Sequence, residues 1–65
     1  RRSVTGEEGM VGMVAVARTA LNPDGIVFVQ GERWNATVEG GPVELGQEVI
    51  ITKVEGLKLW VIKKQ

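Results

Sequence analysis

A small all-β protein, built as one closed barrel of five short strands, is the fold class that this sequence predicts. The 65-residue chain divides into short apolar runs separated by turns that contain Gly or Pro. No run keeps a helical period over the ~12 residues that an isolated helix needs. Strands without a covering helix must pack their apolar faces against one another, and closing the sheet also pairs its edges.

The first predicted strand runs from Met10 to Ala20, because its side chains are mostly small or β-branched and are apolar on both faces. A helix is the alternative, since Ala15 and Ala17 favour one. The three valines of the segment favour a strand, because β-branched side chains lose χ1 freedom in a helix. We expect Gly12 to mark a bulge or a bend.

A β-turn is predicted at Asn22-Pro23-Asp24-Gly25, where Pro23 sets φ for the second position and Gly25 can adopt the positive φ that closes the turn. Ile26 to Gln30 is the second predicted strand, and Gly31 with Glu32 reverses the chain.

The third predicted strand, Arg33 to Glu39, has the clearest alternation. Trp34, Ala36 and Val38 share one face and polar residues share the other, which indicates a half-buried strand. The fourth strand is expected from Gln47 to Glu55. The fifth is expected from Leu57 to Lys63, after a turn at Gly56.

These five elements predict a barrel of the OB type, and a small SH3-like barrel is the alternative. The connection between the third and fourth strands is too short for the helix that commonly plugs an OB barrel. We therefore expect Val43, Leu45 or Trp34 to fill that end. Arg1 to Gly9 is predicted as a flexible leader, and Met10 to Gln65 as the single barrel domain.

The composition excludes most catalytic chemistry. The chain has no Cys and no His, and its eight basic and eight acidic residues cancel. Disulfides and thiolate metal sites are thus excluded, and the only serine, Ser3, has no base to activate it. We predict no enzyme activity, no catalytic residue, no metal, no cofactor and no small-molecule substrate.

Binding of single-stranded nucleic acid is one alternative function, because OB barrels often serve it. Such binders stack bases on exposed aromatic side chains along a basic groove. The chain offers Phe28, Trp34 and Trp60, with Arg18, Arg33 and Lys53 as basic residues and with Glu32, Glu39 and Glu55 to oppose them.

A carrier domain is a second alternative. The segment Glu44 to Val49, followed by Gly56-Leu57-Lys58, resembles biotinyl domains, which present a modified lysine on a hairpin. Lys58 would be the modified residue. The simpler explanation is a Gly hairpin with a solvated lysine.

The last strand offers a candidate protein interface. Leu57, Leu59 and Val61 share one face, which leaves Trp60 and Ile62 outside. An exposed Trp flanked by lysines is typical of interface anchors. The alternative is that the leader covers Trp60 with Val4 and Met10. We predict Trp60, Ile62 and Phe28 as the contact residues.

The spacing of turn glycines and core residues resembles the C-terminal soluble domain of the NfeD family. The residues that carry this resemblance are Gly9, Gly12, Thr19-Ala20-Leu21, Pro23, Gly25, Val27, Gly31-Glu32, Trp34, Ala36, Gly46, Val49, Val54, Gly56-Leu57, Leu59 and Val61.

The resemblance implies the soluble tail of an integral membrane protein whose transmembrane helices precede Arg1, so we expect a fragment of a longer chain. It also implies stomatin- or flotillin-like partners, a role in membrane organisation or protein quality control, and a location at the cytoplasmic face of a membrane. Longer relatives carry a serine protease domain upstream. The family's barrel has no agreed catalytic residue to transfer.

Overall fold

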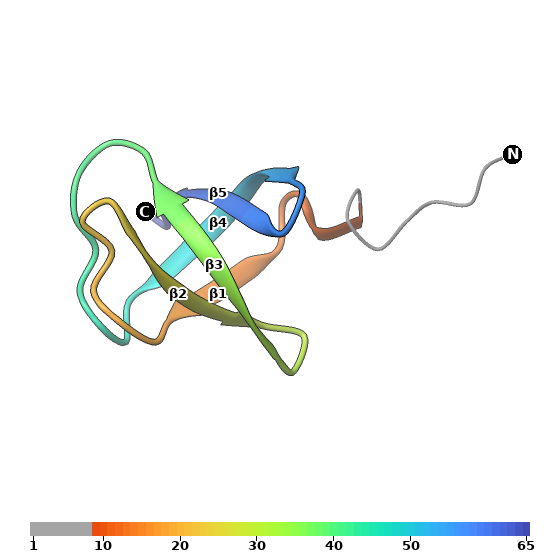
Figure 1. The fold of residues 1–65 in the computed structure, drawn as a ribbon. Coiled ribbons are helices and arrows are strands. Elements are labelled where there is room, and N and C mark those ends of the chain that lie inside the picture. Colours follow the sequence, from red (N-terminus) through yellow and green to blue (C-terminus); the bar gives the residue numbers. More distant parts are fainter. Residues whose placement is uncertain (1–8) are drawn as a thin grey trace, which may run out of the picture.

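Five strands form the ring of the barrel in the computed structural model, which describes residues 9–65 (Figure 1). They are β1 (Val14–Ala17), β2 (Asp24–Val29), β3 (Glu32–Val38), β4 (Glu48–Glu55) and β5 (Lys58–Lys63). The order around the ring is β1-β2-β3-β5-β4, and β4 pairs back with β1. Only the β3–β5 pair is parallel among these strands. The predicted closed five-stranded barrel is confirmed.

The first strand is much shorter than predicted. Instead of Met10 to Ala20, β1 covers only Val14–Ala17. Gly9 and Met10 belong to a helical turn, and Gly12 follows it with a φ of 93°. The Gly12 N–H donates to the Ile51 carbonyl over 2.7 Å, which holds this entry against β4. Since β1 is extended, the helix alternative for this segment is wrong.

Gly25 has a different role from the one predicted. It lies inside β2, and its φ is not in the positive region. A Cβ atom at this position would collide with the Ala20 carbonyl, the Thr19 hydroxyl and the Leu21 side chain. Gly25 is therefore needed because the loop after β1 crosses it closely, rather than because a turn requires its freedom of φ.

The reversal between β2 and β3 occurs one residue earlier than predicted. Val29 pairs with Glu32, so Gln30 and Gly31 form a two-residue turn. Their φ values are 52° and 77°, as a type I′ turn requires. The twist of this turn matches the twist of the strands, and the hairpin projects from the ring in Figure 1.

Gln30 is the one non-glycine residue with positive φ among residues 9–65. Asn tolerates this backbone region better, and Asn-Gly is the preferred type I′ sequence. We expect Gln30→Asn to raise the free energy of unfolding by about 0.5 kcal/mol. Urea denaturation measures this as a higher midpoint at an unchanged slope. An unchanged or lower midpoint would contradict it.

The core fills the inside of the ring with small and medium apolar side chains. Its members are Met10, Ala15, Ala17, Leu21, Val27, Val29, Ala36, Val38, Val43, Val49, Ile51, Leu59 and Val61. The predicted inward face of the last strand is confirmed for Leu59 and Val61, whereas Leu57 lies in the β4–β5 turn and is 82% exposed.

One end of the barrel is closed by Leu21 and Val43. Their backbones exchange two hydrogen bonds, of 2.8 and 3.0 Å, and both side chains are fully buried. Leu45 is 69% exposed, so the prediction that it helps to fill this end is wrong. Trp34 is half-buried against the core near the β2–β3 hairpin, away from this end.

The alternative that the leader covers Trp60 named Val4 and Met10. Met10 belongs to the buried core cluster instead. Val4 and most of the predicted leader lie outside the described residues. The described part of the chain contains no helix long and apolar enough to span a bilayer.

Candidate protein-interaction surface

Reactive groups do not converge anywhere in residues 9–65. No three carboxylate, His or Cys side chains of this segment come together where they could hold a metal ion. Its glutamates all lie on the exposed surface. Carboxylates spread over an open surface lack the burial and the fixed spacing that general acid–base chemistry needs.

Lys58 does not occupy the position that the carrier-domain alternative requires. The tip of the β4–β5 hairpin is Gly56-Leu57, and Lys58 is already paired with Glu55 in the ladder. Its ammonium group lies 4.5 Å from the centroid of the Trp60 ring. The lysine therefore covers an aromatic face instead of projecting from the turn.

Apolar side chains form a continuous band on the outside of the barrel, which we call the outer stripe. Its members are Phe28 on β2, Val14 and Val16 on β1, Ile50 on β4, and Ile62 and Trp60 on β5. Each of them alternates with buried residues of its own strand, so its side chain points outward.

Cross-strand pairs connect the members of the outer stripe. Val16 lies opposite Phe28, Val14 lies opposite Ile50, and Ile50 lies opposite Ile62. Side chains in such pairs are about 5 Å apart at Cβ and contact one another. The band thus crosses β2, β1, β4 and β5 without a polar interruption along its line.

Trp60 is held in place at one end of the outer stripe. Its indole N–H donates to a Glu55 carboxylate oxygen over 2.9 Å. Lys58 lies over its ring at 4.5 Å, and Lys53, its neighbour on β4, lies at 5.9 Å. A bulge in β4 next to Lys53 brings the Thr52 hydroxyl within 3.2 Å of the Trp60 carbonyl. These contacts order the indole before any partner arrives.

Phe28 has a similar environment at the other end. The Arg18 guanidinium lies 4.3 Å from the centroid of its ring. Arg33 is its cross-strand neighbour on β3. Cation–π contacts at exposed sites contribute roughly 0.5–1 kcal/mol each, so a partner can displace the cations at small cost.

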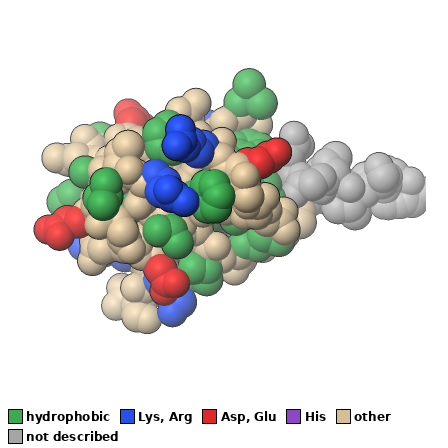
Figure 2. Space-filling view, turned by 90° about the horizontal axis from the view of Figure 1, so that it is seen from below, with side chains coloured by type: hydrophobic (Ala, Val, Ile, Leu, Met, Phe, Trp, Pro, Cys, Tyr) green, Lys and Arg blue, Asp and Glu red, His purple; other side chains and the backbone are tan. Residues whose placement is uncertain are grey.

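Figure 2 shows the surface of one side of the barrel. Hydrophobic side chains lie around two basic ones near its middle, and the acidic side chains lie closer to its outline. Val14 and Ile62 are 41% and 40% exposed, and the other stripe residues are half-buried. Partly exposed aromatic and aliphatic groups with basic neighbours are the composition of a binding surface rather than of a catalytic cleft.

The predicted contact residues all lie on this band, but three of its members were not predicted. Trp60, Ile62 and Phe28 are the predicted residues, whereas Val14 and Val16 on β1 and Ile50 on β4 were not recognised. Two apolar runs, Val14–Ala17 and Val49–Ile51, were the available signal. A short strand that is apolar on both faces must expose one of them unless another layer covers it.

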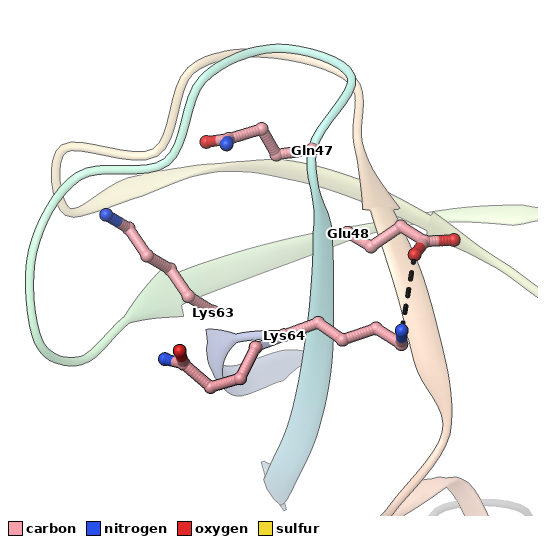
Figure 3. Close-up of a pocket in the computed structure, with 5 residues that line it drawn as sticks. Gln47, Glu48, Lys63 and Lys64 are labelled. Carbon is pink, nitrogen blue, oxygen red and sulfur yellow. Dashed lines mark ion pairs between the residues drawn. The ribbon is translucent and has the colours of Figure 1, made fainter.

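A second surface feature is a shallow polar hollow at the end of the barrel where β5 ends. It is lined by Gln47, Glu48, Lys63, Lys64 and Gln65. The Lys64 ammonium is 3.7 Å from a Glu48 oxygen, whereas Lys63 extends away from this pair (Figure 3). Both charges of the ion pair are about half exposed, so solvent screens it.

The fold and this surface together define a small OB-type barrel with an apolar band on its outside. The model of the NfeD-like C-terminal, partner-binding domain matches residues 7–63. The chain belongs to this family, and the resemblance noted in the sequence is confirmed. The family description assigns binding of a partner to the domain.

Comparisons with known proteins show the same relationship. The chain is 33% identical over its whole length to the membrane-bound protease PH1510 of Pyrococcus horikoshii, of which it spans only 15%. The C-terminal domain of stomatin operon partner protein 1510-C from the same organism superposes with a TM-score of 0.87 at 35% identity, covering 95% of this chain and 98% of that one.

A further match is the soluble domain of a membrane protein from Corynebacterium glutamicum, implicated in regulation of membrane protease activity. It superposes with a TM-score of 0.82, covering 89% of this chain and 97% of that one, at 21% identity. At that identity the likeness speaks for the fold alone.

Proposed function

We propose that this domain is a non-catalytic module that binds a stomatin- or flotillin-like membrane protein through its outer stripe. The single observation that carries the proposal is the band itself, with an aromatic residue ordered at each end. Family membership supports a protein as the partner. The name of the 1510-C relative, a stomatin operon partner protein, supports the class of partner.

The energetic argument rests on the two aromatic anchors. Interfaces draw most of their binding energy from a few residues, among which Trp and Arg are common. Trp60 already has its indole fixed by Glu55 and Lys58, so little side-chain entropy is lost when a partner covers it. The aliphatic residues between the anchors supply apolar area that a partner removes from water.

The membrane setting of PH1510 indicates where the domain works, because this relative is named as membrane-bound. We propose that this barrel is likewise the soluble part of a membrane-anchored chain, at the cytoplasmic face. There it would help to organise membrane proteins or to direct their quality control.

Substitutions on the outer stripe test the proposal. We expect Trp60→Ala to weaken binding of a stomatin-like protein from the same organism at least 30-fold, about 2 kcal/mol, and Ile62→Ser to weaken it about fivefold. Isothermal titration calorimetry measures both effects. Circular dichroism establishes that each variant is folded.

Leu57→Ser is the matched control, because Leu57 is an exposed apolar residue on the neighbouring turn and lies outside the stripe. It should change the affinity less than twofold. Undiminished binding by folded Trp60→Ala and Ile62→Ser would overturn the assignment of this surface.

A further inference from the structure

We infer that the part of the partner that covers the outer stripe is an acidic amphipathic helix of about three turns. This inference rests on the proposed function and goes beyond it, because it specifies the chemistry of the partner. It follows from three features of the stripe: its bordering charges, its length and the closure of the ring.

The charges that border the outer stripe are predominantly basic. Arg18 and Arg33 are next to Phe28, and Lys53 and Lys58 are next to Trp60. Residues 9–65 carry six basic and six acidic side chains in all. Four of the six basic ones thus lie at the two aromatic residues.

Acidic side chains balance only part of this charge. Glu48 pairs with Lys64, and Glu55 lies 4.0 Å from Lys53. Within residues 9–65 no carboxylate lies within 4.0 Å of the charged groups of Arg18, Arg33 or Lys58. A partner with carboxylates at both ends of its apolar face would therefore complement the stripe, and opposite charges would speed its association.

The pattern of charges around the stripe favours a protein, rather than a lipid surface, as the partner. Glu48 and Glu55 lie at the border of the stripe beside the basic residues. A bilayer of anionic lipids would place negative charge against both carboxylates. A folded segment can place its acidic groups opposite the basic residues alone, which is how interfaces gain specificity.

The closure of the ring favours a helix over an extended segment. Every strand of the barrel pairs with a strand on each side. The stripe residues Phe28, Ile50 and Trp60 lie where both neighbouring strands are present, so an extended segment cannot add to the sheet along the stripe. A helix satisfies its own backbone hydrogen bonds. The stripe crosses four strands, or roughly 15 Å at ~4.8 Å per interval, and about ten helical residues cover that length.

Two synthetic 15-residue peptides test the inference directly. Both carry Leu at positions 3, 6, 7, 10 and 14, and their helical polar faces carry Glu in one peptide and Lys in the other. We expect the Glu peptide to bind the domain at least tenfold more tightly at 50 mM salt and to lose at least fivefold in affinity at 300 mM. Fluorescence anisotropy measures both.

Charge-removing variants locate the contact. The double variant Arg18→Gln/Lys58→Gln should weaken binding of the Glu peptide at least fivefold. Lys63→Gln should leave it within twofold, because Lys63 ends β5 and alternates with the stripe residues Trp60 and Ile62 along that strand. Equal binding of the two peptides, or no binding of either, would overturn the inference.

Vesicles of phosphatidylglycerol separate a lipid surface from a protein. Retention of the domain on these vesicles, with loss of retention in the double variant, would overturn the inference in favour of a membrane. Binding of the Glu peptide combined with normal partner capture by Trp60→Ala would contradict the proposed function instead. If the Glu peptide does not bind the domain and Trp60→Ala no longer captures the stomatin-like partner, only the present inference is contradicted.

Discussion

Replacing Gly25 by Ala is expected to destabilise the barrel by about 3 kcal/mol, at the upper end of the range for overpacked sites. The added methyl group would meet the Ala20 carbonyl, the Thr19 hydroxyl and the Leu21 side chain at once. Ile26 N–H also donates to the Thr19 hydroxyl over 3.0 Å. The loop after β1 can therefore not move away without losing contacts to β2.

Gly9→Ala is the matched control for this substitution. An added Cβ at Gly9 meets nothing within 4 Å, and its φ is not positive. Guanidinium or urea denaturation should show a large fall in midpoint for Gly25→Ala and none for Gly9→Ala. Equal midpoints for Gly25→Ala and the unmodified chain would show that the crossing of the loop is not tight.

Leu21→Ala is expected to lower the free energy of unfolding by about 3 kcal/mol. Leu21 is a fully buried side chain, and with Val43 it closes one end of the barrel. Removing it loses its burial and leaves a cavity, which costs roughly 2–5 kcal/mol in well-packed cores. A domain of this size is stable by only about 3–10 kcal/mol, so a large part of its stability would be lost.

Leu57→Ala removes the same atoms from an exposed position and provides the comparison. Leu57 is 82% exposed in the β4–β5 turn, and such changes usually stay within ~0.5 kcal/mol. Thermal and chemical unfolding of both variants separate burial from residue type. Similar midpoints for the two variants would mean that Leu21 does not close the barrel end.

Strand alternation made most of the fold predictable. In β3, polar residues separate Trp34, Ala36 and Val38, so the sequence itself distinguishes the inner face from the outer one. In β5 the residues that alternate with Leu59 and Val61 are the apolar Trp60 and Ile62, so the contrast is weaker there, although the predicted inner face is confirmed. Burial on one face of a strand leaves this signal because polar groups are costly inside.

Two features of the fold depend on contacts between distant parts of the chain and were missed. The late start of the first strand, at Val14 rather than Met10, accompanies the hydrogen bond from the Gly12 N–H to the Ile51 carbonyl, which no local pattern reveals. The need for Gly25 comes from the loop that crosses it. A glycine after Pro looks the same in sequence whether a turn or a close approach requires it.

The candidate surface was predictable at its ends and not in its middle. Trp60 and Phe28 attract notice because they are two of only three aromatic residues, and Lys58 lies two positions before Trp60. Val14, Val16 and Ile50 lie in runs where neighbouring residues are equally apolar. Only the pairing of β1 with β4 decides which of these side chains face water.

The return pairing of β4 with β1 has a consequence for how the molecule assembles. Val14 meets Ile50 only after nearly the whole chain between them has been placed. The entropy lost in joining such distant segments comes before most of the stabilising contacts, which is typical of slow-folding topologies. No hairpin of this barrel is a stable fragment by itself, so the outer stripe is complete only when the last strand is in position.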